Sequence, residues 1–385
     1  MLYGEGIKLT ILRRMQLFIG GKSFMRKYNI GWGLTSLCNM HCAFCYSHET
    51  RERSDDISIS DWIRFVDENY QQIDSINYGT GENSIIDDFF KFIEYVRDKY
   101  PTISQSVTTN GYIAQRINEN PELKRIFLKS IDEIDVSLDF ADREKHCSFR
   151  GQEYAYDWAI KTLSDLKETD KKVTIVFIGC EDSLKKDNID GLFAIAKKYN
   201  TILRLNIYRP VSDNKSINDR FLLSSNTLYS ALEYINSKYR VISLSDILLG
   251  NIFTPDNNIT ENTGIGSIRI LPDGKICPST YLINAKYSSK YSIKQKNVLS
   301  HIHFPEFEEA LIPNKCMDCP IKEKCKGGVY DRRILWYGTL KERDPYCPTR
   351  FGESINKRKF NVAPHERISI HDMYLPTLFF SNKEN

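Results

Sequence analysis

Short apolar runs alternate with amphipathic segments over the first half of the chain. β-branched and aromatic residues gather in six runs where we expect strands: 29–34, 75–78, 104–108, 134–138, 173–178 and 202–208. Apolar residues recur with a helical period in the segments between them, where we expect helices: 60–71, 87–100, 122–129, 154–168 and 189–199. Alternating strands and helices form a parallel sheet with helices packed on it. About six such units are too few for a closed eightfold barrel, so the pattern predicts an α/β fold with an open, partial (β/α)6 barrel.

The pattern changes after residue 210. A helix is expected at 227–238, and a β-hairpin at 267–277 around the turn Pro272-Asp273-Gly274. We divide the chain into an N-terminal lead-in (1–29), the partial barrel (30–225), a bridging helical and loop region (226–263), a small cysteine-rich domain (264–350) and a C-terminal segment (351–385).

The C-terminal segment is too apolar for a free tail, with Leu378, Phe379 and Phe380 close together, and we expect it to dock on the body. Two interpretations of this docking remain open. The segment covers apolar surface, or it also contributes polar side chains to the substrate site, the candidates being His365, His371 and Tyr374.

Composition narrows the function classes. The 385 residues include 53 Lys and Arg against 50 Asp and Glu, a balance that argues against a dedicated nucleic-acid or membrane surface. The apolar stretch at residues 7–18 is interrupted by Lys8, Arg13 and Arg14, so no membrane helix is expected and the protein is predicted to be cytoplasmic. Ten cysteines in a reducing compartment favour metal binding over disulfides.

Three of these cysteines lie on one short loop after the first expected strand. Cys38, Cys42 and Cys45 can bind three irons of a cubane and leave the fourth iron without a protein ligand. The position at the C-terminal end of a barrel strand is where active sites lie in barrel enzymes. Three buried cysteines, or part of a zinc site, are the alternatives.

The loop resembles the CxxxCxΦC signature of the radical S-adenosylmethionine (SAM) superfamily, with Phe44 as its aromatic residue. The resemblance implies a [4Fe–4S] cluster on the three cysteines, SAM on the open iron, and Phe44 near the adenine. It also implies SAM contacts at residues that follow the next strands: Gly81, Glu82, Asn110, Ser137, Asp139 and Arg150. The family's Gly-Gly-Glu-Pro motif is altered here at Thr80 and Asn83, which weakens the match at that strand.

A second cysteine group, Cys316, Cys319, Cys325 and Cys347, supplies four thiolates from one segment. A zinc knuckle is one interpretation. The segment also resembles the SPASM extension of radical SAM enzymes, which implies an auxiliary [4Fe–4S] cluster. A full SPASM domain has seven cysteines and two auxiliary clusters. Here Val329 replaces one cysteine and only Cys277 remains of the inner set, so one auxiliary cluster is expected. Cys277 is then a packed remnant or a thiol facing the substrate.

The resemblance implies that an external donor of the flavodoxin or ferredoxin type reduces the cluster. SAM cleavage then gives a 5′-deoxyadenosyl radical, which abstracts a substrate hydrogen; no general acid or base is assigned. Peptide or protein side chains are the expected substrate class, although the 37 residues before Cys38 are too few for a peptide-recognition domain. The alternative is a lyase, epimerase or dehydrogenase for a sugar, aminoglycoside or nucleotide. For that substrate, anion contacts are expected from four arginines: Arg204, Arg209, Arg332 and Arg333. A non-catalytic iron–sulfur module is disfavoured by the intact cysteine loop with SAM motifs behind it.

Overall fold

The chain folds around one open sheet. The computed structural model describes residues 26–47, 55–257, 259–283, 290–355, 360–362 and 367–383. Six parallel strands form the centre of the sheet in sequence order: β1 (Tyr28–Trp32), β2 (Ile73–Tyr78), β3 (Ser104–Thr109), β4 (Glu133–Ser137), β5 (Lys172–Gly179) and β6 (Ile202–Ile207). The predicted partial (β/α)6 barrel is confirmed, and each of these strands lies within two residues of its expected position at either end.

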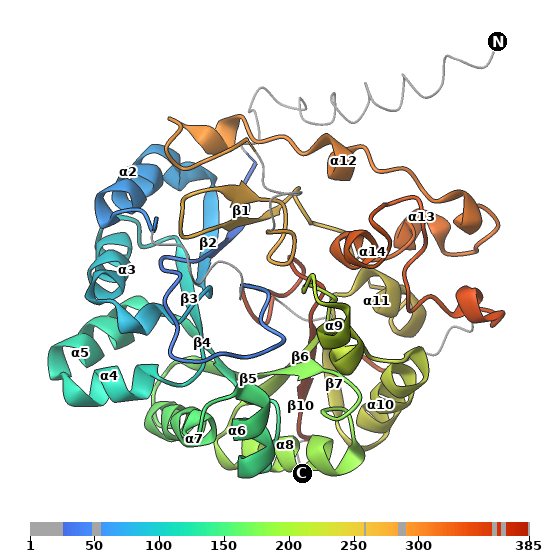
Figure 1. Cartoon of the computed structure of the whole chain (residues 1–385), viewed down its shortest axis with the longest axis horizontal. Coiled ribbons are helices and arrows are strands. Elements are labelled where there is room, and N and C mark those ends of the chain that lie inside the picture. Colours follow the sequence, from blue (N-terminus) through green and yellow to red (C-terminus); the bar gives the residue numbers. More distant parts are fainter. Residues whose placement is uncertain are drawn as a thin grey trace.

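Helices cover the outside of this curved sheet (Figure 1). They are α2 (Ile59–Asn69), α3 (Asp87–Lys99), α4 (Ile113–Glu119), α5 (Pro121–Ser130), α6 (Arg143–Arg150), α7 (Ala155–Leu166) and α8 (Lys186–Lys198). Local signals set their ends. In α5, Pro121 occupies the first turn and the Asn120 side chain accepts from the backbone N–H of Glu122 and Leu123.

The core lies between these helices and the sheet. Trp32 of β1 meets Phe65 of α2 and Phe92 of α3 edge to face, with ring centroids 5.2 and 5.4 Å apart. All three side chains are fully or almost fully buried. Such aromatic clusters bury large apolar areas, and they fix how each helix sits on the sheet. The C-terminal ends of the strands are therefore held in a rigid frame.

The second half of the chain extends the same sheet at both edges. α9 (Lys215–Phe221), α10 (Ser225–Lys238), β7 (Arg240–Leu244) and α11 (Ile247–Phe253) follow the barrel. β8 (Ser267–Ile270) then pairs parallel to β1, and β9 (Ile276–Cys277) pairs antiparallel to β8 as the expected hairpin. In the described part of the cysteine-rich segment that follows, the α-helices are short: α12 (Pro305–Glu308), α13 (Lys322–Cys325) and α14 (Tyr330–Tyr337). The sheet thus runs across the boundary expected at residue 264.

The last strand, β10 (Leu378–Ser381), lies between β6 and β7 and is antiparallel to both (Figure 1). The residues before it cover the N-terminal ends of the barrel strands. Ser369 Oγ donates to Glu133 of β4 at 2.8 Å, and Asn29 of β1 donates to the Ile370 carbonyl at 2.8 Å. The C-terminal segment therefore fills the end of the barrel opposite the cysteine loop. His365 lies outside the described residues.

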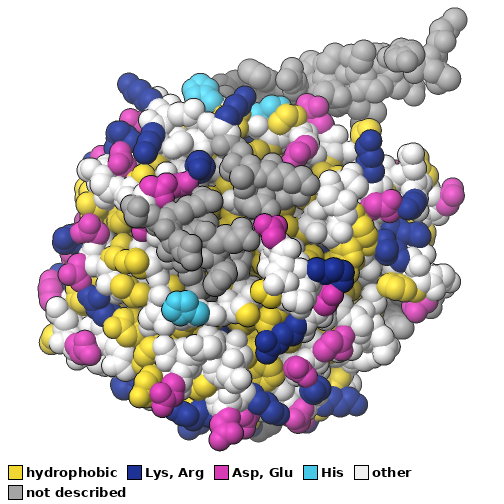
Figure 2. All heavy atoms as spheres, in the orientation of Figure 1, with side chains coloured by type: hydrophobic (Ala, Val, Ile, Leu, Met, Phe, Trp, Pro, Cys, Tyr) yellow, Lys and Arg dark blue, Asp and Glu magenta, His cyan; other side chains and the backbone are white. Residues whose placement is uncertain are grey.

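On the face shown in Figure 2, acidic and basic side chains are interspersed. Within the described parts of the chain, no helix is long and apolar enough to cross a membrane. The stretch at residues 7–18 and most of the predicted lead-in lie outside those parts.

Candidate active site

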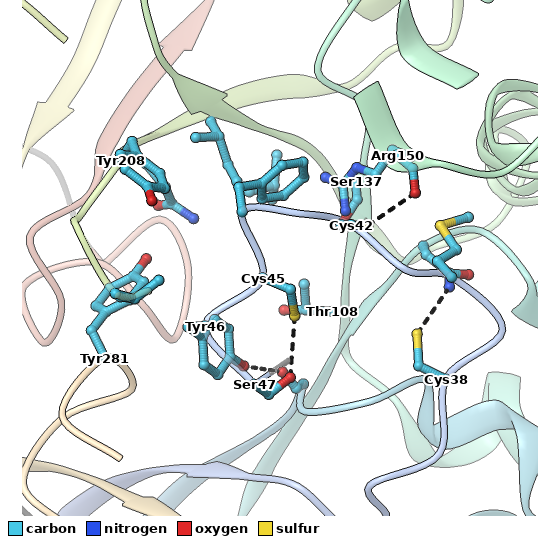
Figure 3. Close-up of a pocket in the computed structure, with 18 of the residues that line it drawn as sticks. Cys38, Cys42, Cys45, Tyr46, Ser47, Thr108, Ser137, Arg150, Tyr208 and Tyr281 are labelled. Atoms are coloured by element: carbon cyan, nitrogen blue, oxygen red, sulfur yellow. Dashed lines mark hydrogen bonds between the residues drawn. The ribbon is translucent and has the colours of Figure 1, made fainter. Parts of the chain in front are cut away.

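The cysteine loop lies over the C-terminal ends of the barrel strands. Cys38, Cys42 and Cys45 all line one cavity, which we call the cysteine cavity (Figure 3). Its other walls come from the ends of successive strands, and include Gly81, Thr108, Asn110, Ser137, Ile178 and Tyr208. The cavity encloses about 970 Å³ with its open mouth included, within the size range of cofactor sites.

Each thiol of the loop has a polar neighbour. Asn110 Nδ2 lies 3.9 Å from Cys38 Sγ, Cys42 Sγ lies 3.3 Å from the Arg150 carbonyl, and Cys45 Sγ lies 3.2 Å from Ser47 Oγ. In the part of the chain described, no three metal-binding side chains converge on one ion. In a cubane each thiolate binds a different iron, so the sulfurs surround the cluster instead of meeting at a point. Three thiols around one roomy cavity fit that requirement.

Gly81 and Glu82 hold the cysteine loop from behind. The Glu82 N–H donates to the Leu37 carbonyl at 2.9 Å, next to Cys38. The Glu82 carboxylate is buried and accepts from Ser84 Oγ, Thr109 Oγ1 and the Asn110 N–H, at 2.6, 2.9 and 2.8 Å. Burial raises the pKa of Glu82. The resemblance implies that this carboxylate contacts SAM; in the structure it accepts from the Asn110 backbone, and Glu82 is not among the residues that line the cysteine cavity.

Gly81 allows this close approach. Its φ is +66°, and a Cβ there would lie 2.4 Å from the Leu37 carbonyl oxygen and 2.6 Å from that of Thr35. Both neighbours are backbone atoms, so they can move only if the loop moves. Any side chain at this position would therefore displace the cysteine loop.

We expect Gly81→Ala to reduce 5′-deoxyadenosine formation from SAM by at least tenfold, about 1.4 kcal/mol in activation free energy, because the thiols leave their positions. Gly352→Ala is the matched control: Gly352 has a φ of +75°, and a Cβ there would meet no atom within 4 Å, so this variant carries the same backbone strain without the clash. Equal activity in the two variants would show that the contact with Leu37 does not position the loop. Chromatographic quantification of 5′-deoxyadenosine under dithionite provides the measurement.

Asp139 also acts behind the cavity wall. Its carboxylate is fully buried and accepts from Arg150 Nε at 2.6 Å and from the Ile178 N–H at 2.9 Å. Arg150 in turn lines the cysteine cavity, with its guanidinium carbon 5.1 Å from the centre of the Phe44 ring. Asp139 thus positions Arg150, while Arg150, Phe44 and Ser137 face the cavity.

His146, near this pair, is a buried neutral base. Its Nδ1 accepts from the Asp139 N–H at 3.1 Å, and burial lowers its pKa to about 3. The ring is therefore uncharged at neutral pH and contributes a hydrogen bond to the end of β4 rather than a charge to the cavity.

A second cavity continues from the first into the barrel. This lumen cavity shares Tyr46, Gly79, Thr108, Asn206, Arg209 and Tyr281 with the cysteine cavity. Arg204, Arg269, Asp331 and His371 also line it. Sequence reasoning missed Tyr46, Tyr208, Tyr281 and Arg269. Only Tyr46 carried a signal, because it directly follows Cys45.

The four distal cysteines meet at a separate small cavity. Cys316, Cys319, Cys325 and Cys347 all line it, together with apolar residues and with Lys322, Arg343 and Thr349. Two short elements, the turn before α13 and α13 itself, bring the first three together, and the chain returns after α14 to add Cys347. Four thiols around one apolar space fit a closed cluster site.

The remaining candidates from the sequence are Cys277 and the four arginines, and the structure places only some of them at the two cavities. Cys277 is fully buried in a small apolar cluster with Leu271 and Ile283, as expected for a packed remnant. Arg332 and Arg333 are fully buried in protein contacts: Arg332 pairs with Asp246 and Asp344, and Arg333 donates to backbone carbonyls. Neither arginine lines the cysteine or lumen cavity, so of the four arginines proposed for anion contacts only Arg204 and Arg209 do so.

Comparisons with known proteins agree with this geometry. The sequence model of the Radical SAM superfamily matches residues 32–182. The mycofactocin maturase MftC of Mycolicibacterium smegmatis is 22% identical over 355 residues, covering 86% of this chain and 86% of the relative. The antilisterial bacteriocin subtilosin biosynthesis protein AlbA of Bacillus subtilis is 23% identical over 324 residues, covering 81% of this chain and 69% of the relative.

A solved structure shares the fold. Streptococcus suis SuiB bound to precursor peptide SuiA superposes with a TM-score of 0.65 at 16% identity, covering 89% of this chain and 80% of that one. Residues 32–182 form a Radical SAM domain, and members of that superfamily use SAM and a [4Fe–4S] cluster. Over most of its length the chain is similar to maturases of the SPASM type.

Proposed function

We propose that Cys38, Cys42 and Cys45 bind the [4Fe–4S] cluster whose open iron receives SAM. The observation that carries this proposal is that all three thiols line one cavity with Asn110, Ser137 and Arg150. When bound, the cluster and SAM supply a 5′-deoxyadenosyl radical that abstracts a hydrogen atom from the substrate.

The chain's own residues then bind and orient. Phe44 stacks on Phe149 with ring centroids 4.4 Å apart, which fixes an apolar wall for the adenine. Asn110 and Ser137 present polar atoms at the ends of β3 and β4, where the ribose and the amino-acid part of SAM are expected to bind. Gly81 lines the cavity and leaves room for the backbone of Leu37, while Glu82 and Asp139 support the site from behind through the backbone of Asn110 and the guanidinium of Arg150. Tyr208 and Tyr281 line the opposite wall and exclude water from the radical.

We also propose that Cys316, Cys319, Cys325 and Cys347 bind one auxiliary [4Fe–4S] cluster. Their common cavity supports this assignment. Four thiolates occupy every iron of a cubane, so this cluster offers no open iron to a substrate. Burial of Cys277 in an apolar cluster supports the absence of an inner auxiliary cluster.

The proposed substrate is a peptide or protein side chain. Two relatives that align with most of this chain are named as a maturase and a bacteriocin biosynthesis protein, and the related solved structure holds a precursor peptide. A low-potential donor of the flavodoxin or ferredoxin type is proposed to reduce the cluster. The proposed location is the cytoplasm, because a chain with ten cysteines and thiolate-bound clusters is favoured by a reducing compartment.

Iron content tests the cluster assignment. We expect about eight irons per chain after anaerobic reconstitution, because seven cysteines provide one open and one closed site. Colorimetric iron and sulfide assays with elemental analysis for zinc provide the measurement. About twelve irons would show a second auxiliary cluster, and about four irons with one zinc would show that the distal cysteines form a zinc site.

A peptide assay tests the substrate class. The enzyme is co-expressed with each short reading frame that flanks its gene, and the peptides are examined by mass spectrometry. We expect one peptide to change mass with the wild-type enzyme but not when Cys38, Cys42 and Cys45 are replaced together by alanine. Unchanged peptides, together with turnover of a sugar or nucleotide by the same preparation, would favour the small-molecule alternative.

A further inference from the structure

The lumen cavity contains more positive than negative side chains. Arg204, Arg209 and Arg269 all line it and are at most 3% exposed. Arg204 Nη2 lies 3.0 Å from Asp135, and Arg209 Nε lies 2.7 Å from Asp331. Arg269 forms no ion pair with any carboxylate of the described residues, and its one side-chain hydrogen bond there goes from Nη2 to the Tyr46 hydroxyl at 3.1 Å.

Three buried guanidinium nitrogens of the arginines that line this cavity lack hydrogen-bond partners among the described residues. They are Arg269 Nε, Arg204 Nε and Arg204 Nη1. Burial lowers the pKa of Arg269, which shows how unfavourable an uncompensated guanidinium is at this position. Natural proteins rarely leave buried charged donors unsatisfied, and an unoccupied ligand position is one of the standard explanations.

The neighbouring groups do not compensate the charge. Burial, and then Arg204, lower the pKa of His371 to about 4, so this side chain is neutral at pH 7. Burial alone would raise the pKa of Asp135, but Arg204 and His371 outweigh it and the pKa lies below its usual value. The Asp135 carboxylate is therefore ionised and already held by these two groups. On the side of the cysteine cavity Arg269 meets the phenols of Tyr46 and Tyr281 and the thiol of Cys45, and Cys277 is its partner on β9. No carboxylate is among these groups.

The sequence makes room for Arg269 at this position. Gly31 of β1 is paired in register with Arg269 of β8, and a Cβ on Gly31 would lie 2.6 Å from Arg269 Nη1. The missing side chain thus lets the guanidinium lie across β1 and reach the lumen. A residue of almost any other type at position 31 would push it away.

We propose that the lumen cavity binds a carboxylate of the substrate, with Arg269 as its main partner and Arg204 as a second donor. A guanidinium matches a carboxylate with two parallel hydrogen bonds, which would neutralise the excess charge. Because this cavity opens into the cysteine cavity, the anchored residue lies next to the radical. The inference rests on the proposed peptide substrate and specifies which feature of the peptide is recognised.

Two sources supply the same carboxylate chemistry: the C-terminal carboxylate of the peptide, and an Asp or Glu side chain within it. Three peptide pools distinguish them. The first contains N-acetylated tetrapeptides without Asp or Glu that end in a free carboxylate. The second contains the same sequences as C-terminal amides. The third contains amides with Glu at one fixed position.

Each pool is incubated with the reconstituted enzyme and SAM without a reductant, and the retained peptides are quantified by mass spectrometry after rapid gel filtration. We expect the wild-type enzyme to retain one carboxylate pool about tenfold more than the plain amides, the effect of about 1.4 kcal/mol from a charged hydrogen-bonded pair. This preference should fall below about twofold in Arg269→Gln. Preference for the first or the third pool identifies the source of the carboxylate.

Gly31→Ala and Arg125→Gln complete the design. Gly31→Ala keeps the charge of Arg269 but displaces its guanidinium, so this variant should reduce the preference as well. It provides a second test in case Arg269→Gln misfolds, and the iron content of each variant shows whether it has folded. Arg125 lies on the exposed face of α5 and pairs with Glu122, so Arg125→Gln should retain the full preference.

Equal retention of all three pools by the wild-type enzyme, or an unchanged preference in both Arg269→Gln and Gly31→Ala, would overturn the proposal. If the co-expressed peptide is modified without such a preference, the carboxylate site alone is wrong. If reductant-driven 5′-deoxyadenosine formation is also absent, the proposed function itself has failed.

Discussion

Replacing Cys38, Cys42 and Cys45 together with alanine is expected to abolish 5′-deoxyadenosine formation from SAM. Without the three thiolates the open cluster has no ligands, and reductive cleavage of SAM loses its electron source. The fold should survive, because the loop lies over the strand ends and the aromatic core around Trp32 does not include it. Anaerobic assays with dithionite, combined with circular dichroism, provide both measurements.

Iron content separates the two cysteine groups in the same variant. We expect about four irons to remain, held by the distal cysteines. Cys147→Ala is the control, since Cys147 is only half-buried, donates to the Glu153 carbonyl and lies outside both groups. It should keep full activity and all of its iron. Undiminished 5′-deoxyadenosine formation in the triple variant would contradict the assignment of the loop as the cluster site.

Arg332→Leu is expected to lower the free energy of unfolding by about 3–5 kcal/mol, the usual cost of breaking a buried ion pair from one side. Arg332 is fully buried, with Nη1 2.7 Å from Asp246 and Nη2 2.6 Å from Asp344. Burial already raises the pKa of Asp344 against the opposing effect of Arg332, so removal of the arginine leaves two buried carboxylates close together. Anaerobic urea denaturation followed by circular dichroism gives the measurement.

The loss should depend on pH in a defined direction. A carboxyl with a raised pKa in the folded state destabilises the protein above its unfolded pKa, so the penalty should shrink as the pH falls and Asp344 takes up a proton. Arg143→Leu is the control because Arg143 and Asp157 form an exposed pair, and its loss should cost less than about 1 kcal/mol. Equal losses in the two variants would show that the Arg332 cluster contributes no more than a surface pair.

Hydrophobic periodicity predicted the barrel strands well because each of them is encoded by a short apolar run in the local sequence. The run 173–178 is mostly apolar and β-branched, follows two lysines and precedes Gly179, and it becomes β5. β7 and β10 escaped prediction for the opposite reason. Phe379 and Phe380 were recognised as apolar, but four residues do not reveal their partners. Their strand character comes from pairing with β6 and β7, which lie far away in the sequence.

Some residues of the candidate site could likewise be predicted from the local sequence, and others could not. The spacing of Cys38, Cys42 and Cys45 is visible in the sequence, and the structure places them around one cavity. Arg269 was not visible as a site residue, since its position depends on β8 joining β1 and on the space left by Gly31. Asp139 and Glu82 are expected to contact SAM, and in the structure their carboxylates hold Arg150 and the Asn110 backbone beside the cysteine cavity. A sequence motif identifies a residue near the site, but it does not show which neighbouring groups that residue contacts.

The place of β10 has a consequence for the order of assembly on the ribosome. Strands β1 to β6 can pair as they emerge, but the free edge of β6 waits for residues 378–381, and among the described strands β7 pairs only with β10. An unpaired strand edge invites aggregation. We therefore expect the nascent chain to depend on chaperones until β10 is released, and stop codons shortly before residue 378 to yield insoluble protein although every cysteine is present.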